Sequence, residues 1–183
     1  MTEQQPQALK AIGELDLGRF QRPVIEGYPN RFIRAAWYLV NALVFGSPVL
    51  GLLPSSIKRN LLIAFGAKVG PGFVCKPRVN IKNPWFLSVG TSVWIGEGVW
   101  IDNLCDVEIG DNVCISQGAR LLTGSHDWSD PAFPFFAEPI VIGSEVWITA
   151  FREIRPGVTV PGRCVVLRDL SKRDVREWLE SSH

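Results

Sequence analysis

The sequence has almost no net charge and few of the residues that form metal or disulfide sites. Its 183 residues include 19 Lys and Arg against 18 Asp and Glu, a formal charge of +1, and the basic residues are scattered. This balance gives no sign of a nucleic-acid surface. The four cysteines, Cys75, Cys105, Cys114 and Cys164, show no CxxC spacing. We therefore interpret them as core residues with reduced thiols in a cytoplasmic protein, and not as disulfides or metal ligands.

A cleavable signal peptide is also missing from the sequence. The first apolar segment begins only after about thirty polar or mixed residues, whereas a signal peptide has its apolar region near the start. Residues 1–30 instead look mostly irregular. The 46% of hydrophobic residues is sufficient for one compact domain with an elaboration.

A six-residue periodicity dominates the chain from Val69 to Val166. Every sixth residue, counted within successive blocks, is aliphatic with one exception: Val69, Cys75, Ile81, Val89, Ile95, Ile101, Ile109, Ile115, Leu121, Ile142, Ile148, Ile154, Val160 and Val166. Such a hexapeptide repeat is typical of a solenoid, in which each unit makes a short strand and a turn and three units close a triangular coil. A β-sandwich is the alternative, but its strands alternate with period two and do not keep a six-residue phase.

The first two coils are longer than three hexapeptides. Their starting residues, Val69, Val89 and Ile109, are 20 residues apart. Three hexapeptides account for about 18 of these, so about two residues must bulge out of each coil. We place the bulges at Leu87-Ser88 and Val107-Glu108.

The third coil contains a larger insertion. Ile109 and the next coil start, Ile142, are 33 residues apart, so about 13 residues leave the coil, as a loop over residues 127–139. Glycines such as Gly90 and Gly110 follow several of the anchors. They fit tight corners where the backbone needs either a positive φ or a close approach.

Two helices are predicted before the repeat and one after it. Asn30 can cap a helix over residues 31–46, and a second helix runs from Pro54 to Phe65, where Gly66 ends it. The resulting division of the chain is a tail and helical cap (1–66), the β-helix (67–168) and a short charged helix (169–183).

The segment between Ile33 and Leu53 has few charges and is long enough to consider a transmembrane span. Arg34, Asn41 and the Gly-Ser-Pro break after Phe45 argue against one continuous helix. Two interpretations remain, and they are compatible. Residues 31–53 either cap the open end of the solenoid, which would otherwise expose unpaired strand edges, or rest on a membrane as an interfacial helix.

Three tryptophans, Trp94, Trp100 and Trp147, each occupy a position next to an inward anchor. They should therefore point outward from the coils. Exposed tryptophans on such a face indicate packing against a neighbouring subunit or a ligand, or packing within the chain.

His126 is the natural candidate for a general base. The only other histidine is His183 at the end of the chain, and His126 lies where the third coil gives way to the loop. An imidazole can take a proton from a hydroxyl at neutral pH, which an ordinary carboxylate does poorly. A histidine that only forms a hydrogen bond at the base of the loop is the alternative.

Several segments of the chain resemble the hexapeptide-repeat acetyltransferases. Within that family the similarity is greatest to the colanic-acid-biosynthesis type, a sugar O-acetyltransferase, and covers roughly residues 15 to 160. The segments are VWIGE (93–97), IGDNV (109–113), GSHDWSDP (124–131), PIVIG (139–143) and VWI (146–148). Hexapeptides alone are a weakly specific sign of this family, but their combination with the His-Asp loop motif is a strong one.

This resemblance implies a left-handed parallel β-helix of about five coils, the last incomplete, with an N-terminal helical cap. It implies a homotrimer with active sites between subunits, acetyl-CoA as the cosubstrate and a sugar or lipid-linked sugar as the acceptor, in exopolysaccharide or other surface-glycan biosynthesis. His126 would be the base. The other expected site residues are Asp102, Asn103, Asp127 and Trp128 for the acceptor, and Trp147, Thr149, Ala150 and Arg168 for the cofactor. No metal is expected, because the zinc carbonic anhydrases of this fold need three histidines per site.

The C-terminal part departs from the family pattern. Thr149 replaces a glycine where the pantetheine arm would pass, and about one hexapeptide is missing before Arg168. Such a deletion turns the following chain to another face of the prism and would aim Arg168 away from the CoA phosphates. The alternative function is therefore a hexapeptide-repeat scaffold with impaired CoA binding.

Overall fold

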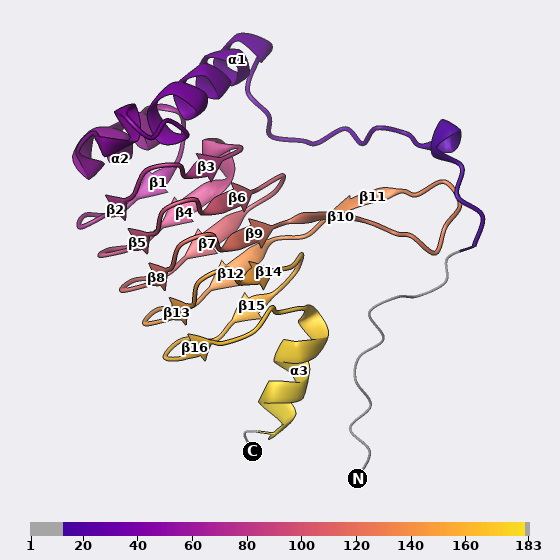
Figure 1. Cartoon of the computed structure of the whole chain (residues 1–183). Helices are drawn as coiled ribbons and strands as arrows, with labels where there is room; N and C mark the ends of the chain where they lie inside the picture. The colour runs from indigo at the N-terminus through magenta and orange to yellow at the C-terminus, as the bar shows by residue number, and fades with distance from the viewer. Residues whose placement is uncertain (1–12, 182–183) are drawn as a thin grey trace.

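A parallel β-helix forms the body of the protein (Figure 1). The computed structural model describes residues 13–181. Each of the first four coils contributes one strand to each of three parallel sheets, and the fifth coil contributes to the first two, with strand orders β1-β4-β7-β12-β15, β2-β5-β8-β13-β16 and β3-β6-β9-β14. The strands are β1 (Lys68–Val69), β2 (Val74–Cys75), β3 (Asn80–Ile81), β4 (Leu87–Val89), β5 (Trp94–Ile95), β6 (Trp100–Asp102), β7 (Val107–Ile109), β8 (Cys114–Ile115), β9 (Arg120–Leu122), β12 (Ile140–Ile142), β13 (Trp147–Ile148), β14 (Glu153–Ile154), β15 (Thr159–Val160) and β16 (Val165–Val166). The predicted solenoid of about five coils is confirmed.

The hexapeptide anchors line the interior of the body. Every predicted anchor is at most 7% exposed. Anchors of successive coils stack in register, as Ile81, Ile101 and Leu121 do. Full burial of such a side chain is worth about 1.5–3 kcal/mol relative to leaving it in water. The regular six-residue spacing therefore corresponds to a continuous apolar core.

The cysteines divide between inside and outside. All four are free thiols. Cys75 is a buried anchor, and burial raises the pKa of its thiol to about 12. Cys114 instead stands on the outer face of the second sheet, in register between Trp94 and Trp147. Its assignment to the core is therefore wrong, because it occupies the outward position next to the anchor Ile115.

The two extra residues of the first coils lie elsewhere than predicted. Leu87 and Val107 are regular strand residues that pair in register, and their side chains are buried. The additional length instead lies in the corners before these two strands, residues 82–86 and 103–106, and the first of these corners contains the short 3-10 helix η4 (Pro84–Phe86). Burial of the two aliphatic side chains keeps them in the strands, so the corners absorb the extra length.

Glycine follows many anchors because neighbouring coils approach closely there. A Cβ on Gly90 would lie 2.8 Å from the backbone of Gly110 in the next coil. Positive φ occurs two residues later, at Ser92 (57°) and Asn112 (54°). Of the two expected reasons for these glycines, the close approach applies and the positive φ does not.

The helices before the repeat cover the first coil (Figure 1). These covering helices are α1 (Arg31–Val40), its π-helical continuation η2 (Asn41–Phe45), η3 (Leu50–Leu52) and α2 (Ser55–Ala64), whereas the short 3-10 helix η1 (Leu17–Arg19) lies apart from them, at the far end of the N-terminal segment. Asn30 caps α1 as predicted, because its Oδ1 accepts the N–H groups of Phe32 and Ile33 at 3.0 Å each. No helix in the described part of the chain has the length and apolarity needed to cross a membrane.

These helices also satisfy the exposed edge of the first coil. Three of their side chains donate hydrogen bonds to its strand carbonyls: Trp37 Nε1 to Ile81 O (2.8 Å), Lys58 Nζ to Cys75 O (2.6 Å) and Arg59 Nη2 to Val69 O (2.7 Å). Trp37 and Lys58 are fully buried. Each of the three sheets thus receives a donor, so the helices replace the coil that is missing at this end.

The opposite end of the body is covered by α3 (Lys172–Ser181). After β16, Leu170 forms a single bridge to Ile154, which is all that remains of the third side of the fifth coil. Asp174 then accepts hydrogen bonds from the backbone N–H and hydroxyl of Ser171, an arrangement typical of a helix start. Val175 of α3 packs against the core.

A β-hairpin projects from the third coil where a loop was predicted (Figure 1). Its antiparallel strands are β10 (Gly124–His126) and β11 (Phe135–Ala137). The N-terminal segment 16–30 runs from the tip of the hairpin back to α1, and Asp16 N–H donates to Pro131 O at 2.9 Å. We call this segment and the hairpin, residues 124–137, the arm.

Candidate functional site

His126 lies at the end of β10 with its imidazole half-buried in the arm. Its Nδ1 is 2.9 Å from the carbonyl oxygen of Phe133. A carbonyl oxygen can only accept, so Nδ1 carries the hydrogen of this bond. In the neutral ring the lone pair is then on Nε2. His126 is therefore held in the tautomer that accepts a proton at Nε2.

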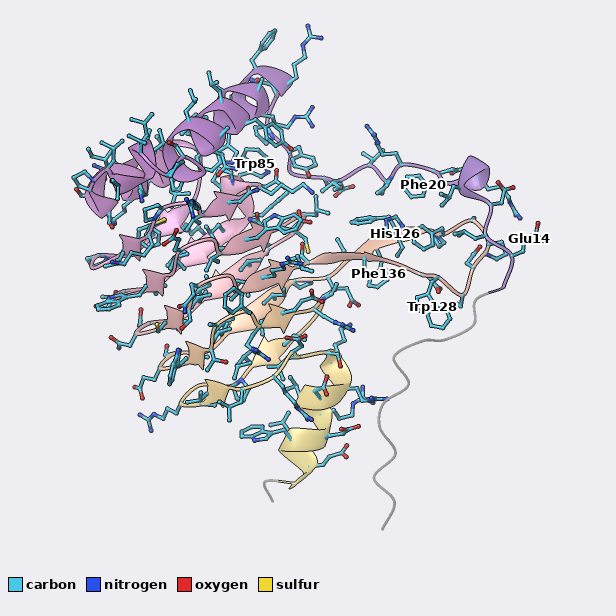
Figure 2. All side chains as sticks on the ribbon, viewed as in Figure 1. Glu14, Phe20, Trp85, His126, Trp128 and Phe136 are labelled. Carbon is cyan, nitrogen blue, oxygen red and sulfur yellow. The ribbon has the colours of Figure 1, made fainter. Side chains whose placement is uncertain are left out.

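Three aromatic rings frame the imidazole. Phe133 stacks on it at 4.2 Å between centroids and 9° between planes, and Phe135 meets it edge-on at 5.4 Å. Phe20 of the N-terminal segment approaches to 5.5 Å, and Figure 2 shows it next to His126. Phe133 has a φ of 50°, a left-handed conformation that is strained for a residue with a side chain. This strained residue supplies both the stacked ring and the carbonyl that hold the imidazole.

His126 faces a cavity of about 820 Å³ between the arm and α1. Its lining combines apolar residues, among them Val24 and Leu104, with four cationic side chains: Arg22, Arg31, Arg34 and Lys82. Tyr28 also lines the cavity, and burial raises the pKa of its phenol. The sequence analysis did not identify the four cations, because they are far apart along the chain and only folding brings them together.

The two polar residues expected at the corner before the arm have different roles. Asp102 pairs with Lys82, with 2.7 Å between Oδ1 and Nζ. Asn103 is completely buried. Its Oδ1 accepts the backbone N–H of Asn83 at 3.0 Å, and its Nδ2 donates to Asn83 O at 2.5 Å. Asn103 is thus neither exposed nor part of the cavity lining, because its amide joins the corners of two successive coils.

Asp127 and Trp128 follow His126 toward the tip of the arm. The Asp127 carboxylate accepts the N–H and the hydroxyl of Ser129, at 2.9 Å and 2.5 Å, and these hydrogen bonds lower its pKa. Trp128 is 43% exposed, and Figure 2 shows it near the tip of the hairpin, beyond His126. Neither residue lines the cavity described above.

The expected cofactor residues Trp147, Thr149 and Ala150 lie on or just after β13, on the opposite side of the body from the arm in Figure 1. Trp147 is 49% exposed and its indole N–H donates to Ser116 Oγ at 2.8 Å. The Thr149 hydroxyl donates to Val166 O at 2.7 Å, across to the next coil. A single chain does not bring these residues to His126.

Arg168 lies near the C-terminal helix. Its Nη2 is 3.7 Å from Asp174 Oδ1. It also lines a smaller, mostly apolar cavity of about 380 Å³ between the fifth coil and α3, together with Val175 and Trp178. The shortened third side of this coil thus leaves Arg168 next to α3.

The three outward tryptophans are exposed as predicted. Trp94 is 57% exposed and Trp100 is 38% exposed, while Trp94 and Trp147 both stand on the second sheet. The guanidinium of Arg120 lies 6.0 Å from the Trp100 ring. Within residues 13–181 there is no group of three or more side chains that could hold a metal ion.

Comparison with known proteins identifies the family of this chain. Over 133 residues, which are 71% of this chain and 70% of the relative, the sequence is 38% identical to a protein of Escherichia coli K12 named as a colanic acid biosynthesis acetyltransferase, WcaF. The chain belongs to the hexapeptide-repeat acetyltransferases. The WcaF protein of Shigella flexneri has the same identity over the same length. No protein-family model matches the chain.

Solved acetyltransferase structures support the fold. A hexapeptide-repeat acetyltransferase from Vibrio cholerae, in complex with acetyl coenzyme A, has a TM-score of 0.63 and 21% identity, and the match covers 76% of this chain and 78% of that one. A maltose O-acetyltransferase from Clostridium difficile 630 has a TM-score of 0.55 and 19% identity, covering 78% and 81%.

Proposed function

We propose that this acetyltransferase moves the acetyl group of acetyl-CoA to a hydroxyl of a sugar, in the biosynthesis of an exopolysaccharide or another surface glycan. One observation carries the proposal. The Nδ1–H bond from His126 to Phe133 O leaves Nε2 as a proton acceptor, and His126 lines a cavity large enough for a sugar. The name of the E. coli relative and the acetyl coenzyme A in the V. cholerae structure support the donor and the type of acceptor.

In the proposed reaction, His126 Nε2 takes the proton from the acceptor hydroxyl as its oxygen attacks the thioester carbonyl carbon. The carbon–sulfur bond then breaks, and the imidazolium returns the proton to the departing thiolate. No acyl-enzyme is needed. Phe20, Phe133 and Phe135 hold the ring in place during both proton transfers. A positioned general base contributes about 10²–10⁴-fold, and the alignment of two bound substrates contributes much of the rest.

The proposed active site requires residues from two copies of the chain. His126 and the residues expected to contact CoA, Trp147, Thr149 and Ala150, are on opposite sides of one chain. We therefore include a homotrimer, in which the second sheet of one copy, with exposed Trp94 and Trp147, meets the arm of the next. Burial of such aromatic side chains is common in stable interfaces.

A weakened scaffold is the second candidate. It is favoured by the fifth coil, where one bridge replaces a third strand and Arg168 lies 3.7 Å from Asp174. Both features weaken the binding that this end of the body can provide for the phosphates of CoA. The scaffold would keep trimer assembly or acceptor recognition without transfer.

Calorimetry with acetyl-CoA, followed by an acceptor screen with product mass spectrometry, separates the two candidates. The acetyltransferase should bind acetyl-CoA with a Kd between about 1 μM and 1 mM, as expected of a working cosubstrate site, and form an O-acetyl sugar. An absence of binding at millimolar ligand would instead favour the scaffold. Arg168→Gln should weaken acetyl-CoA binding if Arg168 meets a phosphate, whereas the matched exchange Arg176→Gln, further along α3, should not.

The proposal also includes a cytoplasmic location with peripheral membrane contact through residues 31–53. Large apolar side chains on this segment are exposed: Phe32, Ile33, Tyr38, Leu39, Leu43, Val49, Leu50 and Leu52. An apolar face of this kind favours the membrane interface. Flotation with liposomes should recover the wild-type protein, and a Phe32→Ser, Leu39→Ser variant should stay in solution. Equal recovery of both would contradict membrane contact.

A further inference from the structure

The cavity next to His126 has a strong local charge in a chain that is nearly neutral. Its described lining includes Arg22, Arg31, Arg34 and Lys82, and no Asp or Glu. The formal charge of the whole chain is only +1. The cations come from the N-terminal segment, from α1 and from the corner after β3. Three separate parts of the chain therefore place like charges around one space, which is unfavourable unless an anion offsets it.

The arginines of this cavity have no anionic partner among the described residues. Arg22, Arg31 and Arg34 form no ion pair with any residue between positions 13 and 181. The Nε of Arg34 is buried and has no hydrogen-bond acceptor there, and its guanidinium lies 5.3 Å from the Tyr28 ring. Only Lys82 is paired, with Asp102 at 2.7 Å. A buried donor without an acceptor is unfavourable, and a ligand oxygen would supply one.

We infer that this cavity binds the acceptor sugar as its phosphate or diphosphate ester, with the phosphoryl oxygens on the arginines and the sugar hydroxyl at His126. This inference rests on the proposed function. Guanidinium groups bind phosphate oxygens through paired hydrogen bonds. A single carboxylate can occupy one guanidinium, so it would leave two arginines unmatched. A diphosphate carries enough charge and enough oxygens for all three.

The phosphate ester can come from two sources, a nucleotide sugar or a lipid-linked sugar. The exposed apolar side chains of Phe32 and Leu39 lie on α1, the helix that supplies Arg31 and Arg34. A lipid tail could leave the cavity along this helix, whereas a nucleoside would have to stay over the cavity. Both sources share the chemistry that the arginines recognise.

Transfer rates with matched acceptors test the inference. Glucose and galactose are each offered as the methyl glycoside, the uridine diphosphate ester and a short polyisoprenyl diphosphate ester, and kcat/KM is measured with acetyl-CoA. We expect the diphosphate esters to be preferred by at least about tenfold, and Arg34→Gln to remove that preference, since hydrogen bonds to charged groups have this magnitude. Arg22→Gln, at an exposed position, should lower kcat/KM for the same esters, whereas Arg176→Gln on α3 should not. The better of the two esters identifies the source.

Methyl glycosides that match the diphosphate esters, or an Arg34→Gln enzyme that keeps the preference, would overturn the inference while leaving acetyl transfer intact. Binding of inorganic pyrophosphate provides a readout that does not need turnover. It should be retained in His126→Asn and reduced by at least about tenfold in Arg22→Gln and Arg34→Gln. If no acceptor is acetylated and pyrophosphate still binds in this pattern, the anion site stands and the proposed function fails. Pyrophosphate binding that is absent, or equal in all variants, would refute the site.

Discussion

The body and the arm of this protein are held together by different interactions. Side chains of the body, such as Ile101 and Leu121, are fully buried and repeat in register from coil to coil. The arm has no such core. Its centre is His126, half-buried between Phe20 and Phe133 and held by one hydrogen bond to a strained residue. The body therefore provides rigidity and position, and the arm provides the proposed chemistry.

The largest effect should come from the core of the body. Leu121→Ala removes a fully buried side chain in the coil that leads into the arm, and should lower the free energy of unfolding by about 2–5 kcal/mol. The same exchange at Leu52, which is 74% exposed, should change it by less than about 0.5 kcal/mol. Denaturant unfolding of both variants measures the difference. Equal losses would mean that the anchors do not form the core of the body.

Substitution of Asn103 tests whether this residue stabilises the body or binds the acceptor. Asn103→Ala leaves the backbone N–H and C=O of Asn83 without partners in a buried corner, so we expect a loss of about 1–3 kcal/mol in the free energy of unfolding. The KM for the acceptor should not change. A raised KM with wild-type stability would instead restore Asn103 to the acceptor-binding role expected from the family resemblance.

Substitutions of Phe133 test how the arm holds the imidazole of His126. Phe133→Ala keeps the left-handed backbone and loses the ring, whereas Phe133→Gly loses the ring and relieves the strain. The free energy of unfolding of the Gly variant should exceed that of the Ala variant by about 1 kcal/mol, the typical cost of a non-glycine residue in this conformation. Both should lower kcat by a similar factor without changing acetyl-CoA affinity, because the imidazole is less well held. Wild-type kcat in either variant would show that the stacked ring is not needed.

The smallest effect should be at α3. Hydrogen bonds from Ser171 hold the pKa of the Asp174 carboxyl below its ordinary value of 3.8. A depressed carboxyl pKa stabilises the fold above pH 3.8, and this contribution is lost as the pH falls through the lower folded value. Amide hydrogen exchange in α3 should therefore accelerate below pH 3.8, relative to the coils. In Asp174→Asn that additional acceleration should disappear, and its persistence would assign the pH dependence to another group.

Sequence periodicity predicted the body because burial requires an aliphatic residue at every sixth position. The same logic located the outward tryptophans Trp94, Trp100 and Trp147. It misplaced the extra residues of the first coils, because Leu87 and Val107 look like additional residues in the count although they are buried strand positions.

The site was less predictable, because its contacts join segments far apart in the chain. His126 could be singled out by its rarity, but its frame of Phe20, Phe133 and Phe135 depends on a hairpin and an irregular segment that have no period. The cations Arg22 and Lys82 are 60 positions apart and gather only in the fold. Asn103 had the residue type of a ligand contact, and only the register of the coils reveals its buried partner Asn83.

The account depends most on His126 as the base, and His126→Asn tests this directly. An asparagine Nδ2 can still donate to Phe133 O, but the side chain cannot accept a proton at the position of Nε2. The transfer rate at saturating acetyl-CoA and acceptor should fall by about 10²–10⁴-fold, with unchanged acetyl-CoA affinity and unchanged stability. A variant that transfers acetyl at the wild-type rate would contradict the assignment of His126 as the base.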